Sequence, residues 1–239
     1  MNWRRTACVA VGAAALAGTA QATITLMDGQ SVPFSAWIND PQQELLVFDK
    51  VFKYESYTSA HFPAADISIG GVVRPSSVPG KIWDVGFDMF FGFGDTTPGD
   101  ASFTEFNLQY TVTLLPTYVA QGWRITDNKL IFNGNSTGPG SFARVDESVL
   151  DANNTLIGQK SVFDIAGPPR QTRLEDQIIW GLPGYTFLEV NKDAKFFAAG
   201  PNDTATASFI RQTFSQVPPP GALTLLGAAG LLLIRRRSR

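Results

Sequence analysis

The sequence predicts an all-β protein, an antiparallel β-sandwich between an N-terminal signal peptide and a single C-terminal transmembrane helix. Three observations lead to the sandwich. Residues 106–115 alternate strictly between apolar and polar side chains, which is the period of a strand with one buried face. Many short runs rich in β-branched and aromatic residues are separated by Gly, Pro, Asn and Asp, as in sheets joined by tight turns. Residues 23–216 contain no convincing amphipathic helical pattern.

The first 22 residues have the layout of a secretory signal peptide. Arg4 and Arg5 precede an apolar, small-residue stretch over 6–18, and Ala20 and Ala22 then occupy the two positions that a signal peptidase recognises. We therefore expect signal peptidase to cleave before residue 23. The run is short and rich in Ala and Gly, which disfavours the alternative of an N-terminal membrane anchor.

The predicted body, residues 23–216, is an exported domain without cysteine, because the single cysteine of the chain lies at position 8. It must therefore be stabilised by burial rather than by disulfides, and its length suffices for one core. It contains 13 Lys and Arg and 21 Asp and Glu, a formal net charge of −8. This charge excludes the basic surface that nucleic-acid binding needs.

The clearest strand of the body is 106–115, with a predicted core face and a predicted solvent face. The core face consists of Leu108, Tyr110, Val112 and Leu114, and the solvent face of Asn107, Gln109, Thr111 and Thr113. Further strands are predicted at 44–48, 52–57, 67–73, 82–91, 129–132, 143–150, 159–165, 185–190 and 208–214. A short helix is predicted at 174–180. We expect the phenylalanines to lie between two packed sheets, and a jelly roll is one strand order that this pattern allows.

The last 23 residues, 217–239, form the third predicted segment. Residues 221–234 are uncharged and apolar on all sides, and arginines follow directly. A helix of this length covers about 21 Å, at the short edge of what spans a bilayer, and arginines reach the interface by snorkelling. The alternative is a buried core helix, which usually keeps a polar stripe. The positive-inside rule predicts a body outside the cytoplasm.

The order of this segment resembles the PEP-CTERM sorting signal of bacteria that make extracellular polysaccharide. The resemblance rests on a proline motif, a short apolar helix and a terminal arginine cluster. Pro219 stands where the family has Glu. The matching positions are Val217, Pro218, Pro219, Pro220, Arg235, Arg236 and Arg237. In that family a membrane enzyme, exosortase, is thought to remove the helix, so the resemblance implies an exosortase-like processing partner and a surface or extracellular destination.

A second, shorter resemblance lies inside the body. The sequence VFDKVF at 47–52 resembles the Gly-Asp-Lys-x-Phe opening of many PEP-CTERM β-proteins, with Phe48 in the position of the glycine. Residues 190–193 and 213–216 resemble the closing segments of the same group. The group has no assigned activity, so the resemblance implies a single-domain fold and a destination only.

The residues that carry catalysis in common enzyme classes are scarce. His61 is the only histidine, and no nucleophile elbow, zinc ligand set, phosphate loop or dinucleotide fingerprint accompanies it. Carboxylates remain as candidates, at 95 and 100 around a loop and in the adjacent pairs 146–147 and 175–176. Acidic loops of this kind can bind calcium, although Asp beside Gly and Pro is first a turn residue. We predict no catalytic residue, no metal site and no cofactor.

Three functions follow as hypotheses. The first is a non-enzymatic, surface- or matrix-destined protein that is held in the membrane by its tail. The second is a carbohydrate-binding module of the polysaccharide matrix, for which the tryptophans at 37, 83, 123 and 180 are candidate platforms, although core packing explains them as well. The third is a glycoside hydrolase built on two facing carboxylates.

Overall fold

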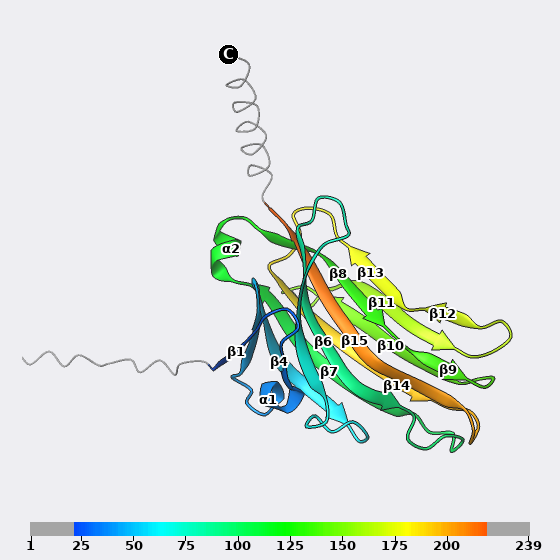
Figure 1. Cartoon of the computed structure of the whole chain (residues 1–239). Helices are drawn as coiled ribbons and strands as arrows, with labels where there is room; N and C mark the ends of the chain where they lie inside the picture. Colours follow the sequence, from blue (N-terminus) through cyan, green and yellow to red (C-terminus); the bar gives the residue numbers. More distant parts are fainter. Residues whose placement is uncertain (1–21, 219–239) are drawn as a thin grey trace, which may run out of the picture.

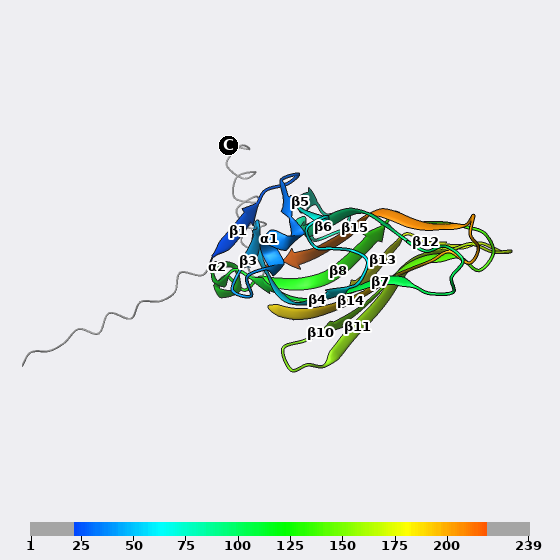
Figure 2. The same cartoon turned by 90° about the horizontal axis from the view of Figure 1, so that it is seen from below.

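The computed structural model describes residues 22–218 as two β-sheets packed face to face (Figures 1 and 2). The predicted signal peptide up to residue 21 and the tail from 219 onward, including the predicted transmembrane helix at 221–234, lie outside the described residues. Among residues 22–218, no helix combines the length and apolar composition needed to cross a bilayer.

The first sheet has eight strands in the order β1–β3–β4–β7–β14–β10–β11–β12. Their bounds are β1 Thr23–Leu26, β3 Glu44–Val47, β4 Lys50–Ser59, β7 Thr104–Leu114, β14 Phe187–Phe197, β10 Phe142–Leu150, β11 Leu156–Ile165 and β12 Gln171–Arg173. The pairing is antiparallel except between β1 and β3, which run parallel. The antiparallel prediction is therefore confirmed for all but this edge.

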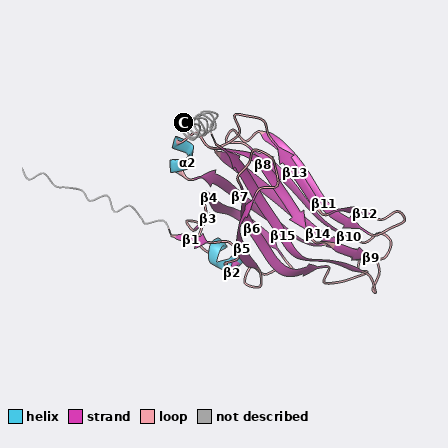
Figure 3. Ribbon diagram, turned by 45° about the horizontal axis from the view of Figure 1, so that its top comes forward, coloured by secondary structure: helices cyan, strands magenta, loops and turns pink. Residues whose placement is uncertain are grey.

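The second sheet has seven strands, six of them in the order β13–β8–β15–β6–β5–β2, with β9 paired to β15. Their bounds are β13 Glu175–Ile179, β8 Arg124–Phe132, β15 Thr204–Val217, β6 Trp83–Gly94, β5 Ser68–Pro75, β2 Ser31–Pro33 and β9 Asn135–Thr137. Two helices of five residues each, α1 (Phe34–Ile38) and α2 (Pro116–Ala120), complete the fold (Figure 3). Each is about one turn and a half long, too short to give a helical period in the sequence.

Strand β7 shows how alternation in the sequence gives a strand one buried face and one outward face. Its burial alternates along all eleven residues, with the predicted core face inward and the predicted polar face outward. The inward side chains meet those of the second sheet in one hydrophobic core. Nine phenylalanines are buried in it, as predicted: Phe34, Phe52, Phe62, Phe87, Phe93, Phe106, Phe132, Phe196 and Phe214.

The predicted helix at 174–180 is wrong. Residues 175–179 form strand β13, which pairs antiparallel with β8. The backbone groups of β8 on the side away from β15 need partners, and the pairing supplies them, aided by an ion pair between Lys129 and Glu175 (2.6 Å). Because β12 belongs to one sheet and β13 to the other, this segment closes the sandwich along one side. Tertiary pairing has overridden a weak local preference.

The segment that resembles Gly-Asp-Lys-x-Phe forms the tight turn from β3 to β4. Phe48, in the position of the glycine, has a φ of 53°, the left-handed region that glycine adopts without steric cost. Asp49 and Lys50 are fully buried and form an ion pair of 2.9 Å. Both also hydrogen-bond the side-chain amide of Gln216 in the last strand. The turn therefore holds the end of β15 in place.

Candidate functional site

The residues predicted for sorting and cleavage lie mostly beyond the described part of the chain. Ala20, Pro219, Pro220, Arg235, Arg236 and Arg237 fall outside it. Ala22 is described, and its carbonyl accepts a hydrogen bond from the Glu44 amide (3.1 Å). Val217 is the last residue of β15 and pairs with Arg124, and Pro218 follows it half-buried. The sheet thus includes the first residue of the proline motif, one residue past the predicted body boundary at 216.

The carboxylates considered for calcium act as turn residues. Asp95 accepts hydrogen bonds from Thr97 N (3.0 Å), Thr104 Oγ1 (3.1 Å) and Ala198 N (2.7 Å). Asp100 accepts one from the amide of the residue two positions later (2.7 Å). Within residues 22–218, no group of three or more His, Cys, Asp or Glu residues is placed to hold a metal ion. The side chains of Asp95 and Asp100 thus accept hydrogen bonds from the amides two residues later, as Asp does in Asx turns.

The sequence pair 146–147 is divided between the two faces of the eight-stranded sheet. Asp146 lies on the outer face, half-buried, and Glu147 points into the core with 2% exposure. Successive side chains of a strand point to opposite faces, so the two acids cannot act on one ligand. His61 is exposed in the loop after β4, and its backbone amide donates to Ser59 Oγ (3.2 Å).

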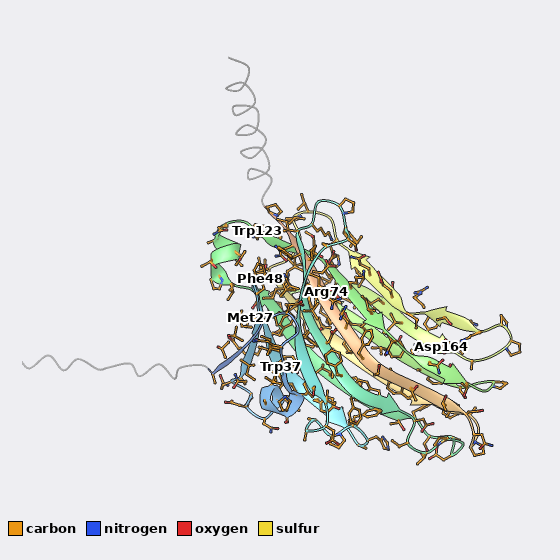
Figure 4. The ribbon with its side chains drawn as sticks, viewed as in Figure 1. Met27, Trp37, Phe48, Arg74, Trp123 and Asp164 are labelled. Atoms are coloured by element: carbon orange, nitrogen blue, oxygen red, sulfur yellow. The ribbon has the colours of Figure 1, made fainter. Side chains whose placement is uncertain are left out.

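The tryptophans divide between core and periphery. Trp37 in α1 is fully buried, while Trp83, Trp123 and Trp180 are partly buried and pack against the edge of the core. Figure 4 shows Trp37 near α1 and Trp123 near α2, at separate places in the fold. The preference for core packing over a sugar platform is therefore confirmed for Trp37.

A broad concave feature lies on the outer face of the eight-stranded sheet, and we call it the sheet-face groove. Its main depression has a volume of about 670 Å³ over β4, β7, β14, β10 and β11. A second depression, about 660 Å³, adjoins it at Asn107, and a third, about 430 Å³, adjoins it at Gln109. Together the three depressions cross most of the sheet.

Strand register aligns the polar side chains of the groove into two rows. One row is Thr58, Asn107, Asp193, Asp146 and Ser161. The other is Ser56, Gln109, Asn191, Ser148 and Gln159. Directly opposed side chains in antiparallel strands lie about 5 Å apart, so each row is a ladder of hydrogen-bonding groups across the sheet.

Each carboxylate at the centre of the groove has its own cationic partner. Asp146 binds Arg144 Nε (2.7 Å), and Asp193 binds Lys195 Nζ (2.5 Å). The hydrogen bond to Asp193 raises the pKa of Lys195 above its usual value. At the β11 edge, Asp176 accepts a hydrogen bond from the Ser161 amide (3.0 Å). The central acids are thus balanced by neighbouring cations, which keeps the net charge of the main depression small.

Two polar atoms of the first row lack a hydrogen-bond partner among the described residues. Asp193 Oδ1 and Ser161 Oγ are both shielded from solvent and unpaired, and Asp146 stands between their two strands in the register. Polar atoms withdrawn from solvent are almost always hydrogen-bonded. Because water does not reach either atom in this conformation, a ligand hydroxyl would pair with them only after the neighbouring side chains rotate.

An aromatic cluster adjoins the groove at the β9–β12 end of the sandwich. Phe103, Phe142 and Phe197 pack with ring centroids 5.5–5.8 Å apart, and Phe103 is 49% exposed. Phe142 and Phe197 share the outer face with Asp146 and Asp193, because they precede or follow them by an even number of residues. Rings beside convergent polar groups are typical of small-molecule and sugar sites.

Sequence reasoning found part of this surface. It assigned Asn107 and Gln109 to a solvent-facing row, which the structure confirms. It did not find Asp193, Ser161 or the phenylalanine cluster, because these residues come together only through strand register. The available signal was the alternation of polar residues in β10, β11 and β14.

Comparison with known proteins gives little further information. No protein-family model matches the sequence, and no curated protein matches it. Among solved structures, the carbohydrate-binding module TmCBM61 in complex with β-1,4-galactotriose is similar at TM-score 0.30 and 11% identity, over 64% of this chain and 88% of that one. The mannan-recognising module TmCBM27 is similar at TM-score 0.32 and 13% identity, over 80% and 96%. A DUF4465 family protein from Bacteroides caccae is similar at TM-score 0.25 and 8% identity, over 70% and 87%. Similarity this low does not identify a ligand.

Proposed function

We propose that the body is a non-catalytic polysaccharide-binding module that uses the sheet-face groove. The observation that carries the proposal is the pair of rows of hydrogen-bonding side chains that strand register aligns across the groove. Sugars present many hydroxyls along an extended chain, and carboxylates, amides and hydroxyls in rows match that pattern. The phenylalanine cluster offers an apolar surface for the face of a sugar ring.

The charge distribution favours a neutral glycan. The central carboxylates of the groove are paired with cations, and the body as a whole has a formal charge of −8. A polyanion would be repelled by this field at low ionic strength. A neutral chain is not repelled, and its binding should change little with salt because it needs no ion exchange.

The test is a glycan panel with a chain ending at Pro218, since Val217 belongs to β15. Asp193→Ala and Ser161→Ala should each weaken binding about tenfold, as expected when a hydrogen bond to a ligand is lost. Arg74→Ala, exposed on β5 of the other sheet (Figure 4), is the matched control and should bind as the wild type does. Retention on no glycan, or equal losses in all three variants, would contradict the proposal.

The same panel distinguishes the hydrolase hypothesis. Asp146 and Asp193 are directly opposed in the register of β10 and β14, so two acids do lie side by side in the groove. If the protein releases reducing ends from a bound glycan and Asp146→Asn abolishes this release, the body is an enzyme rather than a binding module. Binding without product release supports the module.

For destination, we propose that the chain is exported, held in the membrane by its C-terminal tail and then sorted to the surface by an exosortase-like enzyme. The support is the order of segments in residues 217–239. In addition, the ring of Tyr118 packs against those of Phe48 and Trp123, and Figure 4 shows Phe48 and Trp123 toward the end of the sandwich where β15 finishes. Trp and Tyr are enriched at membrane interfaces.

Cell fractionation tests this second proposal independently of glycan binding. The full chain should be found in the membrane or at the surface, whereas a chain ending at Pro218 should be released as soluble exported protein. Identical distributions of the two chains would exclude a sorting role for the tail. The mass of the mature chain would show whether the tail is removed.

A further inference from the structure

Beneath the sheet-face groove, a cluster of five polar side chains lies between the two sheets. Asn128 of β8 and Gln212 of β15 come from the seven-stranded sheet, and Glu147 of β10, Lys160 of β11 and Lys192 of β14 from the eight-stranded sheet. Their exposures are between 0% and 5%. Two buried lysines facing one carboxylate and two carboxamides are unusual, since buried charges are costly unless paired.

Three members of the cluster contact one another. Lys160 Nζ lies 3.0 Å from Glu147 Oε1 and donates a hydrogen bond to Asn128 Oδ1. Asn128 Nδ2 donates to the same Glu147 Oε1 (2.7 Å). A primary amine, the carbonyl of a carboxamide and a carboxylate are thus in mutual contact, and the Asn128 Cγ atom is one bond away from the oxygen that Lys160 touches.

The other two members hold the carboxamide in one orientation. Gln212 Nε2 donates to Asn128 Oδ1, and Lys192 Nζ donates to Gln212 Oε1 (2.8 Å) and to Glu147 Oε2 (2.5 Å). Because Lys160 and Gln212 supply donors on one side of the amide and Glu147 supplies an acceptor on the other, only one placement of O and N satisfies all partners.

We propose that Lys160 Nζ and Asn128 Cγ condense into an intramolecular amide (isopeptide) bond that joins the two sheets. In this step the Nζ–Cγ bond forms and the Cγ–Nδ2 bond of Asn128 breaks. The nitrogen of the side-chain amide leaves as ammonia. The reaction exchanges one amide for another, so it needs no oxidant, cofactor or second enzyme.

The protons balance through Glu147. Its carboxylate accepts a proton from the Lys160 ammonium, and the neutral amine attacks Cγ. Charge develops on Asn128 Oδ1, where the Gln212 Nε2–H already points, as an oxyanion donor does. Protonated Glu147, in contact with Nδ2, then gives its proton to the departing nitrogen. With that proton the nitrogen leaves as ammonia, and the second Nζ proton converts the ammonia into ammonium, which carries away the charge that Lys160 had at the start.

The electrostatics of the cluster support the amine as a nucleophile. Burial lowers the pKa of Lys160 to about 8, with Glu147 opposing the shift and Lys192 adding to it. A substantial fraction of Lys160 is therefore neutral at mildly alkaline pH. Glu147, although burial alone would raise its pKa, is held below its usual pKa by the two lysines, so it starts as the base.

The location gives the bond a structural role. Asn128 and Lys160 are 32 residues apart in the chain and belong to different sheets. The predicted mature body has no cysteine and hence no disulfide. A covalent link between sheets would restrict the unfolded chain as a disulfide does, but reducing agents would not break it.

Peptide mapping of the full chain, expressed and purified from membranes or medium, tests the proposal. Trypsin should yield residues 125–129 joined to residues 145–170, because a modified Lys160 is not cleaved. The mass of the joined species should be less than the sum of the two peptides by one ammonia. Separate peptides 125–129, 145–160 and 161–170 from a folded sample, even after incubation at alkaline pH, would overturn the proposal.

Substitutions test which side chains form the proposed bond. Lys160→Met and Asn128→Leu should abolish the joined peptide, and Glu147→Gln should slow its formation roughly a hundredfold, the usual contribution of general acid–base catalysis. Lys50→Met is the matched control, because Lys50 is also buried against a carboxylate and a carboxamide, and it should leave the joined peptide intact. If the Asn128→Leu variant still shows a mass lower by one ammonia, the assignment of the bond to Lys160 and Asn128 is wrong. The bond would then be assigned to Lys192 and Gln212.

Discussion

Asp164 is the residue whose removal should destabilise the end of the sandwich opposite α2 most strongly (Figure 4). Its side chain, 1% exposed, accepts five hydrogen bonds. Ser136 donates from its amide (2.6 Å) and its hydroxyl (2.8 Å), Thr172 donates from its hydroxyl (2.8 Å), and Arg170 donates twice (2.9 and 2.6 Å). The carboxylate therefore ties β9 of one sheet to β11 and β12 of the other.

The expected cost of Asp164→Ala follows from what the substitution leaves behind. The Ser136 hydroxyl keeps a second acceptor, the backbone carbonyl of residue 164 (3.0 Å). The Ser136 amide, however, loses its acceptor, the Asp164 carboxylate, in a fully buried position. An unsatisfied buried donor costs about 1–3 kcal/mol, and hydrogen bonds to a charged group contribute about 1.5–3 kcal/mol. We expect a loss of about 3–5 kcal/mol in the free energy of unfolding, as found when one partner of a buried charged network is removed.

Arg170→Ala should cost much less. Half of its side chain is exposed (51%), so water already screens the guanidinium, and exposed ion pairs contribute little to stability. The two variants are matched, because both break the same ion pair and only Asp164→Ala removes the buried acceptor. Asp164→Asn keeps the volume and loses the charge, and it should fall between them.

The stability should also depend on pH in a defined direction. Burial alone would raise the pKa of Asp164, but hydrogen bonds from Arg170, Thr172 and Ser136 together lower it below its ordinary value. The unfolded chain therefore binds this proton more readily than the folded chain. The contribution of Asp164 is complete above the unfolded pKa of about 3.9 and is lost as the pH falls through the lower folded pKa.

Urea unfolding of a chain ending at Pro218, followed by tryptophan fluorescence at pH 7 and at steps down to pH 2.5, measures both effects. The difference between wild type and Asp164→Asn should be largest at pH 7 and should shrink toward the acid end. Equal losses for Asp164→Ala and Arg170→Ala, or a difference that grows as the pH falls, would refute the reasoning.

Three further predictions concern packing and metal independence. Gly86→Ala should destabilise the chain by about 1–3 kcal/mol in urea unfolding, because the added Cβ would lie 1.8 Å from a backbone oxygen of β15. Gly92→Ala, on the same strand, is the control. Its Cβ would meet no atom within 4 Å, so its stability should change little. Phe196→Ala should cost about 3–5 kcal/mol in the same measurement, since its fully buried ring packs against three other phenylalanine rings. A chelator or added Ca²⁺ should leave the thermal midpoint unchanged, because the acidic loop at 95–100 is hydrogen-bonded within the fold; a calcium-dependent rise would restore the calcium hypothesis.

The sequence by itself determined the class of fold and most of its strands. Alternation is a local property, since each side chain of a strand points opposite to its neighbours. The pattern at 106–115 therefore predicted both the core face and the solvent face of β7, and turn residues located the breaks between strands. The predicted destination also rests on local order in residues 217–239, where the described structure adds only that Val217 ends β15.

Only the tertiary structure decided which residues meet. Residues 174–180 had a weak local preference for helix, and pairing with β8 made residues 175–179 a strand. Asp193 and Ser161 share one row of the groove, and Asn128, Glu147 and Lys160 share one cluster between the sheets, although long stretches of chain separate them. Strand order and register are set by the simultaneous burial of every strand's apolar face, so no local window of the sequence contains them.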